Sequence, residues 1–192
     1  IIGLSAGLAL EGFKPYVNTI ATFITRRCFE QVAIDLCLHK LPVKLIGNGG
    51  GLVYAPLGPT HQAIEDISIM RTLPNMTIIA PCDSIEMREL VKQSVNYKNP
   101  MYIRLAQGGD KIVTSNAETI KLGKAILKVQ PKEHLFITTG VMTQLAIEAS
   151  KRLDKEMNIK CGVIHLATVK PLDKEILLKW IPKVKKILTV EE

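Results

Sequence analysis

The most informative segment reads Gly58-Pro59-Thr60-His61-Gln62, followed at once by Ala63-Ile64-Glu65-Asp66-Ile67-Ser68-Ile69-Met70-Arg71. The second part carries apolar residues at helical spacing and predicts a helix from about residue 62 to 72. Gly58 gives the backbone freedom and Pro59 fixes φ, so the pair predicts a rigid corner. Thr60 is the predicted N-cap of the helix, because its hydroxyl can accept from an orphan helix N–H.

His61 is therefore expected where the helix begins. The positive end of the helix dipole favours the neutral form of an imidazole placed there, and histidine titrates near neutral pH. A lone histidine is usually a structural residue. A neutral imidazole delivered by a rigid corner suggests chemistry on a hydroxyl or a carbonyl group instead.

Strand-like and helix-like segments alternate on both sides of this corner. We expect helices over 2–10, 26–39, 62–72, 84–96, 142–156 and 173–181, and strands over 15–23, 42–46, 77–80, 101–105, 125–129, 135–139, 161–166 and 187–190. Such alternation predicts an α/β protein with βαβ units and mainly parallel sheets. The glycine-rich run Gly47–Gly51 interrupts the pattern, and we interpret it as a mobile loop that lines the site.

A polar, glycine-containing segment divides the alternation into two units. We predict a first domain over 1–107, a linker over 108–118 and a second domain over 119–192. The sequence begins at Ile1 without an initiator Met and stops directly after a strand-like run. We therefore expect the first domain to be truncated at its N-terminus and the second at its C-terminus.

Composition narrows the class of protein. Apolar residues make up 47% of 192 residues, yet no run reaches the roughly 18 apolar residues of a membrane span, and the start lacks the pattern of a signal peptide. Four cysteines without CxxC or zinc spacing indicate reduced thiols, a cytoplasmic location and no metal site. The net charge is +7, but no aromatic residues interleave with the lysines, which argues against nucleic-acid binding.

Several motifs, in a fixed order, resemble the transketolase family. They are Gly3-Leu4-Ser5-Ala6-Gly7-Leu8-Ala9, Pro15-Tyr16, Lys40-Leu41-Pro42-Val43, the Gly58–Gln62 corner, Leu73-Pro74-Asn75-Met76, Ala80-Pro81-Cys82-Asp83, Thr139-Gly140 and Val169-Lys170-Pro171-Leu172-Asp173. The resemblance implies the pyrimidine-binding fold of thiamine-diphosphate enzymes, followed by a transketolase C-terminal-like domain. It also implies a homodimer or a heterotetramer.

The resemblance assigns roles to individual residues. Phe23 matches the aromatic residue that stacks on the cofactor's aminopyrimidine ring, and Arg26 matches a position that reaches towards cofactor or substrate. His61 matches a catalytic histidine that faces the substrate. Gln107 stands where many relatives place the arginine that binds a sugar phosphate, and Arg104 is a candidate replacement for that anion-binding group.

The chain also departs from the family pattern. Pro56 and Leu57 replace the acidic pair before the Gly-Pro corner, and Gly49 stands where transketolase has a second histidine. The family's activating glutamate falls before Ile1. The Gly-Asp-Gly motif that binds Mg²⁺ and diphosphate does not occur in this sequence, so we expect both to be bound by another domain or subunit. The chain alone is not expected to catalyse a reaction.

Three hypotheses follow from the residues and the resemblance. The first is a part or subunit of a transketolase-like enzyme that transfers a two-carbon ketol unit between sugars. The second keeps the fold and changes the reaction, to a deoxyxylulose-phosphate synthase or the beta subunit of a 2-oxoacid dehydrogenase. The third is a non-catalytic assembly subunit. A glutamate shortly before Ile1 would favour an enzyme over the third hypothesis.

Overall fold

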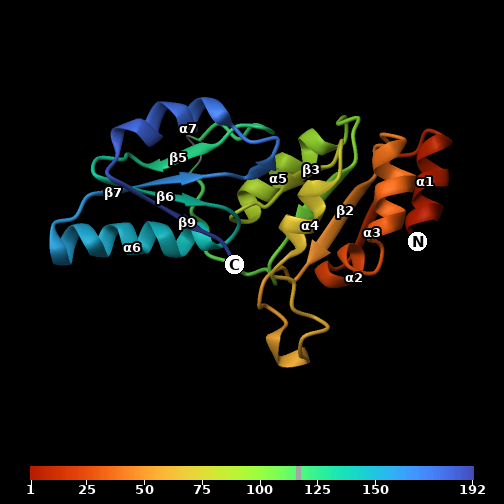
Figure 1. The fold of residues 1–192 in the computed structure, drawn as a ribbon, viewed down its shortest axis with the longest axis horizontal. Helices are drawn as coiled ribbons and strands as arrows, with labels where there is room; N and C mark the ends of the chain where they lie inside the picture. The colour runs from red at the N-terminus through yellow and green to blue at the C-terminus, as the bar shows by residue number, and fades with distance from the viewer. Residues whose placement is uncertain (116–117) are drawn as a thin grey trace. The chain divides into compact units, whose positions relative to one another are not determined.

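The structure, a computed structural model, describes residues 1–115 and 118–192, which form two compact units (Figure 1). The first unit comprises residues 1–79, 91–109 and 192, and the second comprises 80–90 and 110–191. No helix or strand occurs among the described residues between 105 and 125. Residues 116 and 117 of the predicted linker lie outside the described residues, and the predicted domain boundaries remain a prediction.

The first unit is built on parallel strands in the order β1-β2-β4-β3. Their bounds are Tyr16–Ile20 for β1, Lys44–Asn48 for β2, Thr77–Ile79 for β3 and Met101–Arg104 for β4. Every residue of β3 and β4 is buried. Burial along whole strands is typical of parallel sheets that are covered on both faces, which explains their continuous apolar sequence.

The helices of this part of the chain are α1 (Ile2–Leu10), α2 (Ala21–Thr25), α3 (Phe29–Gln31), α4 (Asp66–Thr72) and α5 (Ser84–Ser94), with a π-helix over Val32–Leu38. The expectation of a continuous α-helix over 26–39 is therefore wrong. The expected strand over 15–23 ends at Ile20, so Phe23 belongs to a helix. Helix α1 exposes Leu4 and Leu10, because its apolar residues extend around the whole helix and only one side is covered.

The helix expected from residue 62 begins only at Asp66, with Glu65 as its N-cap. The prediction that Thr60 caps this helix is wrong. The Thr60 hydroxyl instead lies 2.9 Å from Nδ1 of His61. Ala63 exchanges two backbone hydrogen bonds with Gly51, which holds the segment before α4 in a bridge rather than a helical turn.

The second unit contains a four-stranded sheet in the order β5-β7-β6-β9. The strands are β5 (Ile126–Val129), β6 (His134–Thr138), β7 (Cys161–His165) and β9 (Lys186–Val190), with β8 (Thr168–Lys170) as a further short strand. Strand β5 is antiparallel to β7, and the other pairs are parallel. The expected mainly parallel α/β fold is confirmed.

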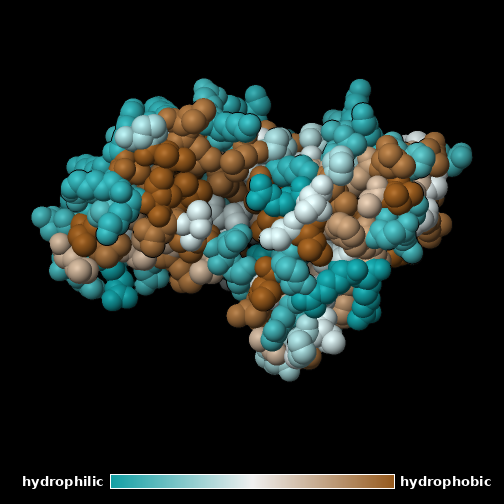
Figure 2. Space-filling model, viewed as in Figure 1, coloured by the Kyte–Doolittle hydropathy of each residue, from teal (hydrophilic) through white to brown (hydrophobic). Residues whose placement is uncertain are grey.

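Helices α6 (Met142–Met157) and α7 (Lys174–Trp180) cover opposite faces of this sheet (Figure 1). Leu135, Ile164 and Leu166 form the core on which Trp180 packs. Hydrophobic side chains also gather on the surface of the unit between these two helices (Figure 2). Among the described residues, no helix is both long enough and apolar enough to span a membrane.

A buried ion pair ties β4 to the start of α4. Arg104 Nε donates to Asp66 Oδ2 at 3.0 Å, and the Tyr102 hydroxyl donates to the same oxygen at 2.6 Å. Burial and the Asp66 carboxylate hold the pKa of Tyr102 well above its usual value, so the phenol remains a donor. The two donors together compensate the carboxylate for its loss of water.

We expect Asp66→Asn to lower the free energy of unfolding of the full-length protein by about 3–5 kcal/mol, because it removes the 3.0 Å carboxylate partner of the buried Arg104 and leaves only the longer pair with Glu192 at 3.9 Å. Urea denaturation checks this value. Glu65→Gln is the matched control, since its partner Arg26 is 38% exposed and an exposed pair contributes about 1 kcal/mol or less. Equal losses of unfolding free energy in the two variants would contradict the expectation that Asp66 contributes more to stability than Glu65.

Candidate active site

The residues at the Gly-Pro corner meet helix α2 in the first unit. The ring centroids of Phe23 and His61 lie 5.1 Å apart with an interplanar angle of 65°, an edge-to-face contact. Thr22 Oγ1 donates to the backbone carbonyl of Thr60 at 3.0 Å, which ties α2 to the corner. The fold thus brings together the two residues that the sequence nominated for cofactor and substrate.

The guanidinium group of Arg26 is hydrogen-bonded to the corner and to Glu65. Its Nη1 donates to the Pro59 carbonyl at 3.1 Å and its Nη2 to the Gln62 carbonyl at 2.9 Å, while Nε pairs with Glu65. The hydrogen bond from Arg26 holds the pKa of Glu65 below its ordinary value. Through these contacts Arg26 positions the corner. A direct contact of Arg26 with the cofactor stays a prediction.

Arg27 is the residue that sequence reasoning missed. Its guanidinium carbon lies 4.0 Å from the centroid of the Phe23 ring, a cation–π contact. The signal that could have found it is the spacing of four residues from Phe23, which places two side chains on the same side of a helical turn.

His61 is half-buried, and its imidazole has one hydrogen-bond partner among the described side chains. Nδ1 contacts the Thr60 hydroxyl, which can donate or accept. No partner of Nε2 occurs in the described part of the chain, so this nitrogen is available to a ligand. A half-buried imidazole fixed through one nitrogen can move a proton through the other.

The glycine run beside the corner has a packing reason. A Cβ on Gly50 would lie 2.6 Å from the Arg104 side chain, and one on Gly49, whose φ is +67°, would lie 2.1 Å from Tyr54. Gly50 also donates its N–H to the Leu105 carbonyl at 2.9 Å. The run that we interpreted as a mobile loop is therefore anchored by close contacts with its neighbours.

Among the described residues, no hydrogen bond, ion pair or ring contact joins the other two expected substrate-binding residues, Arg104 and Gln107, to the Phe23–His61 pair. Arg104 is buried, and its guanidinium is bound to Asp66 and to the Ala63 carbonyl. Gln107 is exposed beyond the end of β4. Substrate binding by either residue stays a prediction. For Arg104 the structure gives a clear alternative, because the buried pair supports the segment that leads into α4.

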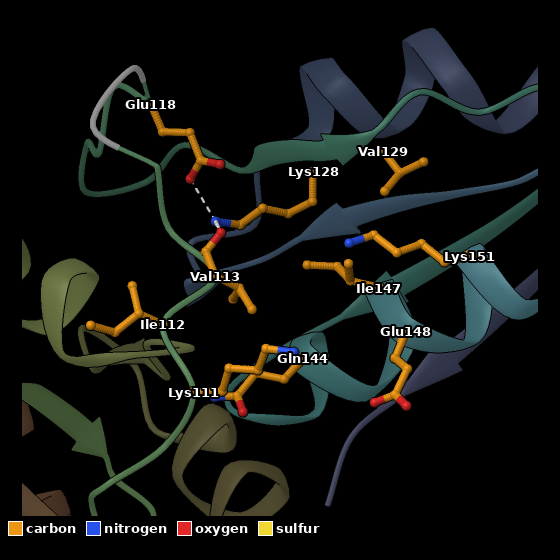
Figure 3. Close-up of a pocket in the computed structure, with 10 residues that line it drawn as sticks. All are labelled: Lys111, Ile112, Val113, Glu118, Lys128, Val129, Gln144, Ile147, Glu148 and Lys151. Atoms are coloured by element: carbon orange, nitrogen blue, oxygen red, sulfur yellow. Dashed lines mark hydrogen bonds and ion pairs between the residues drawn. The ribbon is translucent and has the colours of Figure 1, made fainter.

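A separate cavity of about 340 Å³ lies in the second unit (Figure 3). Its wall is formed by Lys111, Ile112, Val113, Glu118, Lys128, Val129, Gln144, Ile147, Glu148 and Lys151. Lys128 is 2% exposed and pairs with Glu118 at 2.5 Å, so its charge is balanced. None of the site residues expected from the sequence lines this cavity.

Comparison with known proteins adds a family assignment to this geometry. A family model described as the transketolase pyrimidine binding domain matches residues 1–108, and one described as the transketolase C-terminal domain matches residues 123–192. The chain is 36% identical to a subunit of the apulose-4-phosphate transketolase of Phocaeicola vulgatus, over all of this chain and 61% of that protein. It is 39% identical to 1-deoxy-D-xylulose-5-phosphate synthase of Clostridium perfringens, over 31% of that protein.

A solved structure described as a split gene transketolase, an inactive beta4 tetramer, is similar to the whole chain with a TM-score of 0.90 and 34% sequence identity. The chain covers 61% of that structure's length. It therefore spans less than two thirds of the relatives that it matches along its full length.

Proposed function

The chain belongs to the transketolase family, and we propose that it is the pyrimidine-binding and C-terminal part of a transketolase-like transferase. The observation that carries the proposal is the Phe23–His61 pair, an aromatic ring and an imidazole held against one another at the corner. In this proposal the enzyme moves a two-carbon ketol unit from a ketose to an aldehyde acceptor. Thiamine diphosphate, when bound, supplies the carbanion stabilisation that this chemistry needs.

The residues of this chain suit the aminopyrimidine half of thiamine diphosphate. Phe23 is half-buried and presents a flat apolar ring, which fixes the position of an aminopyrimidine at low entropic cost. Arg27 contacts the same ring. Arg26 and Thr22 hold the corner, so the position of His61 relative to Phe23 is set before any ligand arrives. His61 Nε2 would then exchange a proton with the oxygen of the sugar substrate.

In this proposal the remaining half of the site comes from another domain or subunit. The sequence lacks the Gly-Asp-Gly motif for Mg²⁺ and diphosphate, and we propose that another domain or subunit carries both. Two relatives support a separate subunit, since the name of one describes a single subunit of a transketolase and the other is a split gene transketolase forming an inactive beta4 tetramer. We propose a homodimer or heterotetramer in the cytoplasm, acting on a small sugar in carbohydrate metabolism.

A second candidate function is supported by the synthase relative at 39% identity. A deoxyxylulose-phosphate synthase would use the same corner with a 2-oxoacid as donor. Mass analysis of the products formed from candidate ketoses and 2-oxoacids distinguishes the two reactions. Absence of product from both classes, in an assembled protein loaded with cofactor, would favour the non-catalytic subunit instead.

In the assembled enzyme, we expect Phe23→Ala to weaken the apparent affinity for thiamine diphosphate by about 1–3 kcal/mol, the size of a lost aromatic stack on a base-like ring. Activity titrated against cofactor concentration measures this change. Phe13→Ala is the matched control, because Phe13 is exposed and distant in sequence from the corner. An unchanged affinity for Phe23→Ala would remove this residue from the cofactor site.

We expect His61→Ala to lower kcat/KM by about 10²–10⁴-fold, the usual contribution of a positioned acid–base group, with little change in Tm. His39→Ala, at an exposed histidine, should leave kcat/KM unchanged. If His61→Ala lowered Tm while the folded fraction stayed active, the histidine would have a structural role only.

Substrate choice follows from the residues before the corner. Pro56 and Leu57 offer no side-chain acceptor for a sugar hydroxyl, and Leu57 is an exposed apolar side chain. Gln107 cannot make the bidentate charged contact that arginine makes with a phosphate. We expect xylulose 5-phosphate to be a poor substrate relative to a deoxy sugar or one with its phosphate elsewhere, by about one to two orders of magnitude per lost contact.

The measurement is a comparison of kcat/KM for xylulose 5-phosphate, unphosphorylated xylulose and deoxygenated sugars with the assembled enzyme. Xylulose 5-phosphate turning over far faster than the others would show that different residues bind its phosphate.

A further inference from the structure

The second unit contains a buried cluster of three metal-ligating side chains that the proposed reaction does not use. Cys82, Glu86 and His165 are all buried, and one ligand atom from each lies within 4.8 Å of the other two. Cys82 precedes α5, Glu86 lies in its first turn, and His165 ends β7. Glu86 and His165 are 79 residues apart in the sequence, so no short sequence motif predicted a metal site here.

Glu86 has an unsatisfied oxygen in this cluster. Its Oε2 accepts the Cys82 N–H at 2.6 Å and lies 2.8 Å from Nε2 of His165. Its Oε1 is buried and has no hydrogen-bond partner among the described residues. Burying a carboxylate oxygen without a hydrogen-bond partner costs free energy. A bound water or ion is therefore expected beside Oε1.

Two threonines hold the imidazole of the cluster in place. Thr143 Oγ1 lies 2.7 Å from Nδ1 of His165 and 2.8 Å from Oγ1 of Thr138. Histidine ligands of metals normally bond through the second nitrogen in this way, which fixes the ring and its tautomer. Nε2 is thereby left for Glu86 or for a cation beside it.

We propose that Cys82, Glu86 and His165 form a site for a divalent cation of the zinc class. Thiolate, imidazole and carboxylate are the ligands that zinc uses in proteins, whereas Mg²⁺ takes oxygen ligands. The Cys82 thiol gives up its proton to solvent on binding, and the thiolate and carboxylate then balance the two positive charges. The site is distinct from the Mg²⁺ that we assign to another domain, and it does not depend on the proposed function.

Hydrogen bonds link Cys82 of this cluster to residues at the cavity of the second unit. Gln144, which lines the cavity, donates to the Cys82 carbonyl at 2.9 Å. Thr114 Oγ1 lies 3.6 Å from Cys82 Sγ and 3.4 Å from Nζ of Lys128, another residue of the cavity wall. Cys82 is therefore connected to the cavity wall through Gln144 and through Thr114, and Glu118 balances the charge of Lys128.

A cation bound here would join the first turn of α5 to the end of β7, and a water molecule would be its fourth ligand, because the cluster offers three ligand atoms. The alternative without a metal is an ion pair between Glu86 and a protonated His165, beside an inert thiol. The two arrangements differ in one direct property, since only the metal site forms a metal–sulfur bond.

The experiment uses the full-length protein with its partner, depleted of metal by a chelator and titrated with Co²⁺. We expect one equivalent of cobalt to give a sulfur-to-metal charge-transfer band and the intense visible bands of a tetrahedral site, both lost on adding zinc. Cobalt at the proposed Mg²⁺ site has oxygen ligands and gives no sulfur band. The readout is therefore independent of enzymatic activity.

Three variants test which residues bind the metal. Cys82→Ser should abolish the charge-transfer band, and the matched control Cys161→Ser, at another buried cysteine of the same unit, should keep it. Thr143→Val should weaken cobalt binding about 10–100-fold, the usual effect of losing an outer partner of a ligand. The absence of a sulfur band in the wild-type titration would overturn the proposal even if a variant failed to fold, as would equal loss in both cysteine variants.

Discussion

The buried pair between Asp66 and Arg104 is the interaction on which the arrangement of the first unit depends. It fixes the start of α4 to the end of β4, and Tyr102 supplies the second donor that makes a buried carboxylate tolerable. Arg104 also packs against Gly50, where a side chain would not fit. One buried charge pair therefore sets the positions of the glycine run and of the segment that carries His61.

The corner is then held from its other side by α2. Arg26 binds two backbone carbonyls of the corner and Thr22 binds a third. Backbone carbonyls of an irregular segment need partners, and side chains from a neighbouring helix provide them here. The contact between Phe23 and His61 is the consequence of this arrangement, since side chains of the segment that carries Phe23 hold the backbone of the segment that carries His61.

The second unit shows the same physical constraint in its interior. Glu86, His165, Thr143 and Thr138 form a continuous buried polar chain, which must be satisfied internally because water is excluded. The burial of Glu86 raises its pKa, but the contacts with His165 and the Cys82 amide outweigh this effect and keep the pKa below its ordinary value. The carboxylate is thus held in its charged form in the core, where a compensating positive charge is required.

Apolar periodicity and ordered motifs are local properties of a chain, so the alternation of helices and strands, the mainly parallel sheets and the family could all be predicted from the sequence. The sequence also nominated Phe23 and His61, whose contact the fold then made. Long-range packing, by contrast, decided that Arg26 supports the corner, that Arg27 covers Phe23 and that Arg104 is paired within the core. It also decided the late start of α4 and the meeting of Cys82, Glu86 and His165. These outcomes depend on which partners reach one another across long separations, and no local pattern of residues encodes that.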